Sequence, residues 1–203
     1  MYQDAQAFAQ IQEDFDVAAK LIGERVFLGA MEPDHADDFA VWLTDEAVAS
    51  GTRRSSDVVG SSVEDAFLEH TLADPNTRAF SIYDRESGRL IGQCSLHDID
   101  WVHRTAMVGI FIGPAEYRGG GRGAEALEML VYFGFQMLDL QNISLRVLDF
   151  NEGAIACYKK VGFTEWGCRH QSYFYDGARH DEIFMEITRE NWLGIVAAEA
   201  AGS

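Results

Sequence analysis

The chain has 203 residues, 47% of them hydrophobic and 24% charged, a composition typical of a globular protein with one sizeable core. Its formal net charge of −17 argues against nucleic acid as a partner, because a phosphate backbone binds a basic surface. No apolar run approaches the roughly 20 residues that cross a bilayer, and the acidic N-terminus is unlike a signal peptide, so no membrane partner is expected. The cysteines Cys94, Cys157 and Cys168 lack metal-ligand or disulfide spacing, which favours reduced thiols, no bound metal and a cytoplasmic location.

Hydrophobic periodicity predicts the elements of the first third of the chain. Residues 1–24 carry an apolar residue every three or four positions, which predicts a helical extension whose stripe packs on the domain or on a second subunit. A short strand is expected over 25–31, followed by a helix over 32–43 that begins at a proline and two acids. A polar loop at 50–60 then leads into a second helix over 62–73.

Alternating patterns predict the sheet in the rest of the chain. Further strands are expected over 79–83, 89–96, 104–112, 143–148, 163–174 and 182–187, with helices over 126–140, 151–160 and after Thr188. A helix joins the strands at 104–112 and 143–148, so these two should be parallel neighbours. The elements together predict a single α/β (α+β) domain with a mixed, mostly antiparallel sheet of about seven strands and helices on both faces.

The segment from Tyr117 to Ala124 has the composition of a phosphate-binding turn between a strand and a helix. Glycines reach positive φ without obstructing a ligand, and the unpaired amides at a helix start attract anions. The P-loop does not fit, because no Lys-Ser/Thr pair follows the last glycine, and the glycines do not have the dinucleotide spacing G-x-G-x-x-G. The motif Arg118-x-x-Gly121-x-Gly123 resembles the pyrophosphate-binding motif of the GNAT superfamily, the acetyl-CoA-dependent N-acetyltransferases. A flexible glycine turn without a ligand is the alternative.

A second motif in the right order strengthens this resemblance. The pattern Asn151-x-x-Ala154-x-x-x-Tyr158-x-x-x-Gly162 looks like the last conserved segment of the same superfamily, at the usual distance from the first motif. The likeness covers about residues 25–190 and is closest to the branch that holds ribosomal-protein N-terminal acetyltransferases and spermidine acetyltransferases. It implies an N-acetyltransferase domain over those residues.

The resemblance implies acetyl-CoA as co-substrate and no metal. In that family the glycine turn holds the pyrophosphate, the preceding strand splays from its neighbour to pair with the pantetheine arm, and a helix-capping asparagine bonds the cofactor. The residues implied in cofactor binding are Phe111, Ile112, Arg118, Gly119, Gly120, Gly121, Arg122, Gly123, Asn151 and Tyr158. Plain structural roles are also open to these residues: the arginines as turn residues, Phe111 and Ile112 as core side chains, and Asn151 as a helix N-cap.

The resemblance also implies the catalytic groups. Tyr158 matches the tyrosine that protonates the leaving thiolate, and a phenol with a pKa near 10 can protonate a thiolate whose conjugate acid has a pKa of about 8.5. A packed helix tyrosine is the alternative. Many relatives use a glutamate as general base where this chain has Met107. Asp98 is our first candidate for that missing role, ahead of Asp100 and His103.

The sequence therefore predicts an N-acetyltransferase that moves an acetyl group directly from acetyl-CoA to a primary amine in a ternary complex. The acidic charge and the resemblance favour a cationic acceptor, either a polyamine or a protein N-terminus. The expected domain is flanked by the helical extension at 1–24 and a C-terminal helix or tail at 191–203, and a homodimer is left open. A CoA-binding sensor or inactive homologue is the alternative, and an interaction module that has lost its ligand site is a third reading.

Overall fold

The computed structural model describes residue 2 and residues 4–202. This part of the chain is organised around one mixed sheet. Its strands are β1 (Ala19–Ile22), β2 (Val26–Ala30), β3 (Arg78–Asp84), β4 (Leu90–Asp100), β5 (Thr105–Ile112), β6 (Asn142–Leu148), β7 (Thr164–Tyr175) and β8 (Ala178–Thr188). They lie in the order β1-β2-β3-β4-β5-β6-β8-β7, and each neighbouring pair is antiparallel except β5 and β6. The sheet thus has eight strands where the sequence predicted about seven, and the predicted parallel pair is confirmed.

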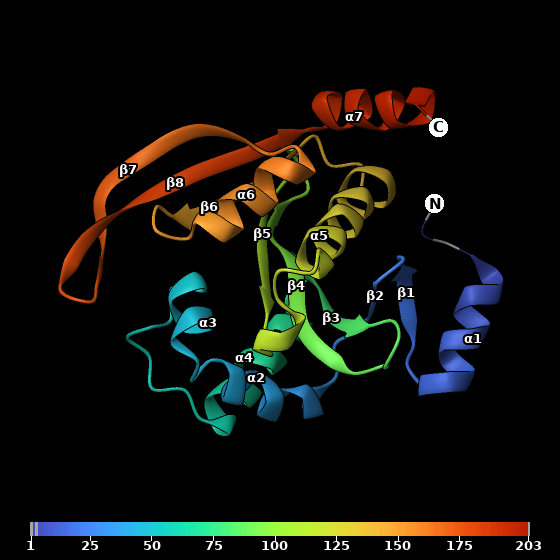
Figure 1. Ribbon diagram of the computed structural model, residues 1–203, viewed down its shortest axis with the longest axis horizontal. Helices are drawn as coiled ribbons and strands as arrows, with labels where there is room; N and C mark the ends of the chain where they lie inside the picture. Colours follow the sequence, from blue (N-terminus) through green and yellow to red (C-terminus); the bar gives the residue numbers. More distant parts are fainter. Residues whose placement is uncertain (1, 3, 203) are drawn as a thin grey trace.

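Helices cover both faces of this sheet, as predicted (Figure 1). They are α1 (Ala5–Phe15), α2 (Ala36–Trp42), α3 (Glu46–Gly51), α4 (Ser61–Ala73), α5 (Arg122–Tyr132), α6 (Glu152–Val161) and α7 (Arg189–Gly202), with 3-10 turns at Pro33–His35 and Ala115–Tyr117 and a π-helical turn at Phe133–Met137. On β5, Phe111 packs on α2 through Phe39, whereas Ile110 and Ile112 pack into the main core with α5. The α2–α4 group and the α5–α6 pair therefore occupy opposite faces. No helix among the described residues is long and apolar enough to span a membrane.

The N-terminal segment does not form the single helix that its periodicity predicted. The first helix, α1, ends because Asp16 adopts the left-handed conformation (φ 55°), and residues 19–22 form a strand that pairs with β2. Ile11 of α1 and Ile22 of β1 pack on Phe27 of β2, so the segment covers the domain's own sheet. The apolar spacing of three or four residues continues past Asp16 to Ala19 and Ile22, so it could not reveal the change from helix to strand.

The two parallel strands separate soon after they meet. Pairing between β5 and β6 extends only over 105–107 and 142–144, after which β5 continues to pair with β4 and β6 with β8. The backbone of β5 beyond Met107 is therefore unpaired on its β6 side, and a gap opens between the strands. In Figure 1 the β7–β8 ribbon extends past α6 at one end of the molecule, while α1 lies beside β1 at the other.

Candidate active site

A pocket of about 540 Å³ opens along the part of β5 that is unpaired on its β6 side. Its walls come from β5, the glycine turn, the first residues of α5, one face of α6 and the end of α3. Eight of the ten residues predicted to bind the cofactor line it: Phe111, Ile112, Arg118, Gly119, Gly121, Gly123, Asn151 and Tyr158. Gly120 lines a neighbouring hollow, and the side chain of Arg122 is turned toward Asp84.

The glycine turn leaves room for an anion at the start of α5. Gly119 and Gly121 have φ values of 78° and 86°, which side chains rarely adopt. A methyl group added at Gly119 would meet nothing within 4 Å, and one added at Gly121 would approach only Arg25, at 3.9 Å. Gly121 is the N-cap of α5 and has no side chain to accept from the first amides of the helix. Those amides and the helix dipole therefore face an open concavity that fits a pyrophosphate.

Both arginines of the turn are engaged by carboxylates. Arg118 donates from Nη2 to Oδ2 of Asp45 (2.7 Å) and to the Gly113 carbonyl, and from Nε to the Ile112 carbonyl (3.1 Å). These contacts tie the end of β5 to the N-cap of α3. Arg122 donates from Nε to Oδ1 of the buried Asp84 (2.8 Å). In this conformation the backbone amides are the groups of the turn that remain open to an anion.

The second motif sits on α6, across the pocket. Asn151 is the N-cap of α6 and accepts from the Ala154 amide (3.2 Å), as predicted from the sequence. Gly162 ends the helix at φ 107°. Tyr158 lines the pocket and packs beside Phe163. Burial raises the pKa of the Tyr158 phenol above its ordinary value, so the hydroxyl is protonated at neutral pH but is a weaker acid than a free phenol.

The three sequence candidates for the general base lie outside this pocket. Asp98 is largely exposed, and Asp100 accepts from the amides of Val102 and His103 (both 2.8 Å) in the β4–β5 turn. These backbone hydrogen bonds, the one from His103 first, lower the pKa of the Asp100 carboxyl. His103 belongs to the same exposed turn. Asp100 therefore shapes the turn, whereas Asp98 contacts a second titratable side chain.

That second side chain is His97, which sequence reasoning missed and which, like the three candidates, does not line the pocket itself. Its Nδ1 lies 3.0 Å from Oδ2 of Asp98, and it pairs across β4 and β5 with Met107. A methyl group added at Gly109 would lie 3.8 Å from its Nε2, so the ring reaches toward the unpaired part of β5. Because a carboxylate only accepts, Nδ1 is the donor and Nε2 of the neutral ring keeps its lone pair. Strand alternation could have found His97, because residues 95, 97, 107 and 109 share one face of the hairpin.

A cluster of arginines lies further along the same face. On β6, Ser144 contacts Met107 (Oγ to Sδ, 3.0 Å), and Arg146 comes two residues later. The buried Glu182 of β8 pairs with Arg146 (3.9 Å), with Arg169 (3.4 Å) and with Arg53, which follows α3. Three guanidinium groups share one carboxylate, so the cluster carries net positive charge within an acidic protein. These residues lie far apart in the sequence, which carries no local signal for the cluster.

Comparison with known proteins defines the class of this fold and site. The family model described as "Acetyltransferase (GNAT) domain" matches residues 25–164, and the chain belongs to that family. Within it, the chain is 30% identical over 113 residues to YdaF of Bacillus subtilis (strain 168), which carries the name of a ribosomal N-acetyltransferase. It is 32% identical over 120 residues to the spermidine N(1)-acetyltransferase of Escherichia coli (strain K12). These matches cover 56% and 55% of this chain and 60% and 64% of the two relatives.

Solved structures show the same fold. The spermidine N-acetyltransferase of Vibrio cholerae, in complex with CoA and spermine, superposes with a TM-score of 0.76. The likeness covers 84% of this chain and 99% of that one, at 23% sequence identity. The resemblance inferred from the two sequence motifs is therefore confirmed for family and fold.

Proposed function

We propose that this chain is an acetyl-CoA-dependent N-acetyltransferase that moves the acetyl group directly to a primary amine in a ternary complex. The observation that carries the proposal is that the open glycine turn and Tyr158 line one pocket, beside the part of β5 that is unpaired on its β6 side. The amides of the turn would hold the pyrophosphate of acetyl-CoA. The backbone of Phe111 and Ile112, which is unpaired on its β6 side, would hold the pantetheine arm, and Asn151 would add a polar contact from α6.

Tyr158 is proposed as the general acid. Loss of CoA from a thioester leaves a thiolate, and protonating it makes that step easier. The phenol sits on the pocket wall and, like any phenol at neutral pH, carries the proton that the thiolate needs.

His97 is proposed as the general base, with Asp98 as its positioning residue. An amine attacks only when it is neutral, so a group near the acetyl carbon must take its proton. Nε2 of His97 reaches toward Gly109 on the unpaired part of β5, and the hydrogen bond from Nδ1 to Asp98 orients the ring. This pair can take the role that a glutamate at the position of Met107 has in many relatives. The sequence pattern indicated Asp98 as the general base, whereas in this proposal Asp98 acts through the imidazole of His97.

The N-terminus of a polypeptide is the acceptor that we propose. An α-amine has a pKa near 8 and needs less help to lose its proton than an amine with a pKa near 10. The arginines around Glu182 would repel a polyamine, which is positive along its whole length, but they can donate to the carbonyls of a peptide. A polyamine is the second candidate, supported by the net charge of −17 and by the spermidine acetyltransferases among the relatives.

The test is the release of free CoA thiol from acetyl-CoA with short peptides and with spermidine as acceptors, followed by mass spectrometry of the products. The proposal expects a peptide acetylated on its α-amine, with turnover that depends on Tyr158. Binding of acetyl-CoA without thiol release for any amine would instead support the CoA-binding sensor that Met107 suggested. Acetylation of a hydroxyl in preference to an amine would contradict the assignment to N-acetyl transfer.

A further inference from the structure

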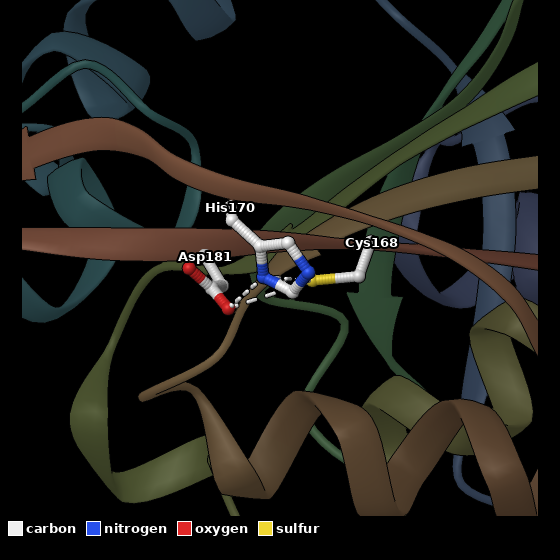
Figure 2. A group of neighbouring side chains, drawn as sticks. All are labelled: Cys168, His170 and Asp181. Carbon is white, nitrogen blue, oxygen red and sulfur yellow. Dashed lines mark hydrogen bonds and ion pairs between the residues drawn. The ribbon is translucent and has the colours of Figure 1, made fainter.

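Three side chains of different chemistry meet on the β7–β8 ribbon, outside the acetyl-transfer pocket. Cys168 and His170 are two residues apart on β7, so they point to the same face of the strand. Asp181 lies on β8, where the pairing of Cys168 with Ile183 brings it opposite His170. Figure 2 shows the thiol, the imidazole and the carboxylate turned toward one another.

The donor atoms of the three side chains converge on one point. Nδ1 of His170 lies 2.7 Å from Oδ2 of Asp181, and Sγ of Cys168 lies 3.5 Å and 3.6 Å from the same two atoms. A nucleophilic cysteine would need a relay, in which the thiol and the carboxylate bond different ring nitrogens. Here both face Nδ1, so the arrangement lacks the geometry of a catalytic triad. It has instead the geometry of three ligands around one centre.

The backbone holds the carboxylate in this orientation. Between Arg169 and Tyr173 the ladder of β7 and β8 is irregular, and Gln171 adopts φ 52°. Its amide thereby donates to Oδ1 of Asp181 (2.8 Å), which leaves Oδ2 facing the other two groups. The amide of Asp181 donates in turn to Asp149 (3.1 Å), in the connection from β6 to α6. Such supporting hydrogen bonds to a ligand are typical of metal centres.

We propose that Cys168, His170 and Asp181 bind a Zn²⁺ ion, with a water molecule as the fourth ligand. Thiolate, imidazole and carboxylate are the ligands that zinc takes, and tetrahedral bonds of about 2.0–2.3 Å place sulfur about 3.5 Å from nitrogen or oxygen. Both sulfur distances already match this value. The nitrogen and oxygen, which share a hydrogen bond without the metal, move apart by about half an ångström. When zinc binds, the thiol of Cys168 releases its proton to solvent. The imidazole of His170 changes tautomer, so that Nδ1 is free to bind the metal and Nε2 carries the proton.

The site is separate from acetyl transfer. Its three residues do not line the pocket, and they lie on the opposite face of the ribbon from Glu182, because residues 181 and 182 are neighbours on a strand. Zinc would bridge β7 and β8 where their ladder is irregular. Through Asp149 it would also brace the connection that leads to Asn151. The sequence predicted no metal, because these ligands come from two strands and lack a recognised spacing.

Metal binding to full-length, tag-free protein tests the proposal. After chelation and reduction, the protein is titrated with Zn²⁺ by calorimetry and with Co²⁺ by absorption spectroscopy. We expect a single equivalent of Zn²⁺ and a thiolate-to-cobalt charge-transfer band. Cys168→Ser and His170→Ala should each weaken zinc binding by at least about tenfold. Cys157→Ser, which removes the half-buried thiol of α6, is the matched control and should bind as the wild type does.

Thiol protection provides a readout that does not depend on any variant. Zinc should slow alkylation of Cys168 by about fivefold or more, measured peptide by peptide, because a coordinated thiolate is shielded. Alkylation of Cys157 should not change. The proposal is overturned if zinc binds without defined stoichiometry, if Cys168→Ser and Cys157→Ser bind alike, or if Cys168 is alkylated at one rate with and without zinc. Acetyl-transfer activity plays no part in these readouts, so the outcome is independent of the proposed function.

Discussion

Nδ1 of His97 lies 3.0 Å from Oδ2 of Asp98, and Nε2 of the same ring points toward Gly109 on β5. The two side chains thus form a pair in which the exposed acid orients the half-buried imidazole. This chain has Met107 where many relatives have a glutamate, and the pair lies beside the part of β5 that is unpaired on its β6 side.

Replacing the imidazole should therefore remove most of the activity. We expect His97→Gln to lower kcat/KM for a peptide acceptor by about 100-fold, the usual size of a general-base contribution. Asp98→Asn should have a smaller effect of about tenfold, because the ring would remain but lose its orientation. The measurement is the pH profile of kcat/KM, whose acid limb should change in both variants. His103→Ala, in the exposed turn of the same hairpin, should match the wild type, and an unchanged His97→Gln enzyme would remove His97 from the mechanism.

Removing the phenol should separate catalysis from binding. Tyr158→Phe should lower kcat by about 100-fold and leave the affinity for acetyl-CoA nearly unchanged, because only the proton donor is lost. Single-turnover kinetics and calorimetry measure the two quantities. Thermal unfolding of the variant checks that the packing of the ring beside Phe163 is kept. If turnover stays within about twofold while chemistry is rate-limiting, Tyr158 is a packing residue only.

The cofactor site is tested at the glycine turn. Gly121→Val forces a β-branched residue into φ 86° at the start of α5 and should weaken acetyl-CoA binding by about tenfold or more. Gly153→Ala is the control, since it also changes a pocket glycine, and an added methyl there meets nothing within 4 Å. Calorimetry with acetyl-CoA gives both affinities. Equal affinity for the wild type and Gly121→Val would place the pyrophosphate elsewhere.

The arginines around Glu182 should select the acceptor. Arg146→Ala removes one guanidinium while Arg53 and Arg169 still pair with Glu182, so the fold should be kept. We expect the ratio of kcat/KM for spermidine over that for a peptide to rise by about tenfold, because a like charge next to the polyamine is gone. Arg179→Ala, which loses an exposed contact with Phe174 on the ribbon, should leave the ratio unchanged. A fall in the ratio would show that Arg146 does not repel polyamines.

The pair of Asp84 and Arg122 should make folding stability depend on pH. Burial opposes ionisation of Asp84, but hydrogen bonds from Ser87 and Arg122 outweigh it and lower the pKa of the carboxyl. A lowered folded-state pKa stabilises the fold above the unfolded value, near pH 4, and the contribution is lost as pH falls through the folded value. Asp84→Asn should therefore cost about 1–3 kcal/mol at neutral pH. In urea titrations this difference should shrink below about pH 4, and a difference that stays constant down to pH 2 would contradict the assignment.

The local features of the site could be read from the sequence. The glycine turn, the Asn151 cap and the position of Tyr158 on a short helix follow from residues within one turn of each other, and the structure keeps all three. The strands from β3 to β8 and the parallel pairing of β5 with β6 were also predicted, because alternation and a crossover helix are local signals. Two such motifs in order were enough to indicate the family.

Tertiary structure alone decided which side chains meet. Asp98 was chosen from its place in the chain, but the register of β4 against β5 puts His97, one residue earlier, opposite Met107. The arginines at Glu182 and the cluster at Cys168 each gather residues from separate strands. A one-residue change of register reverses every side chain of a strand, and no local pattern encodes the register between distant segments. Sequence could therefore give the elements and the cofactor motif, whereas the proposed base and the proposed metal ligands depend on how the strands align.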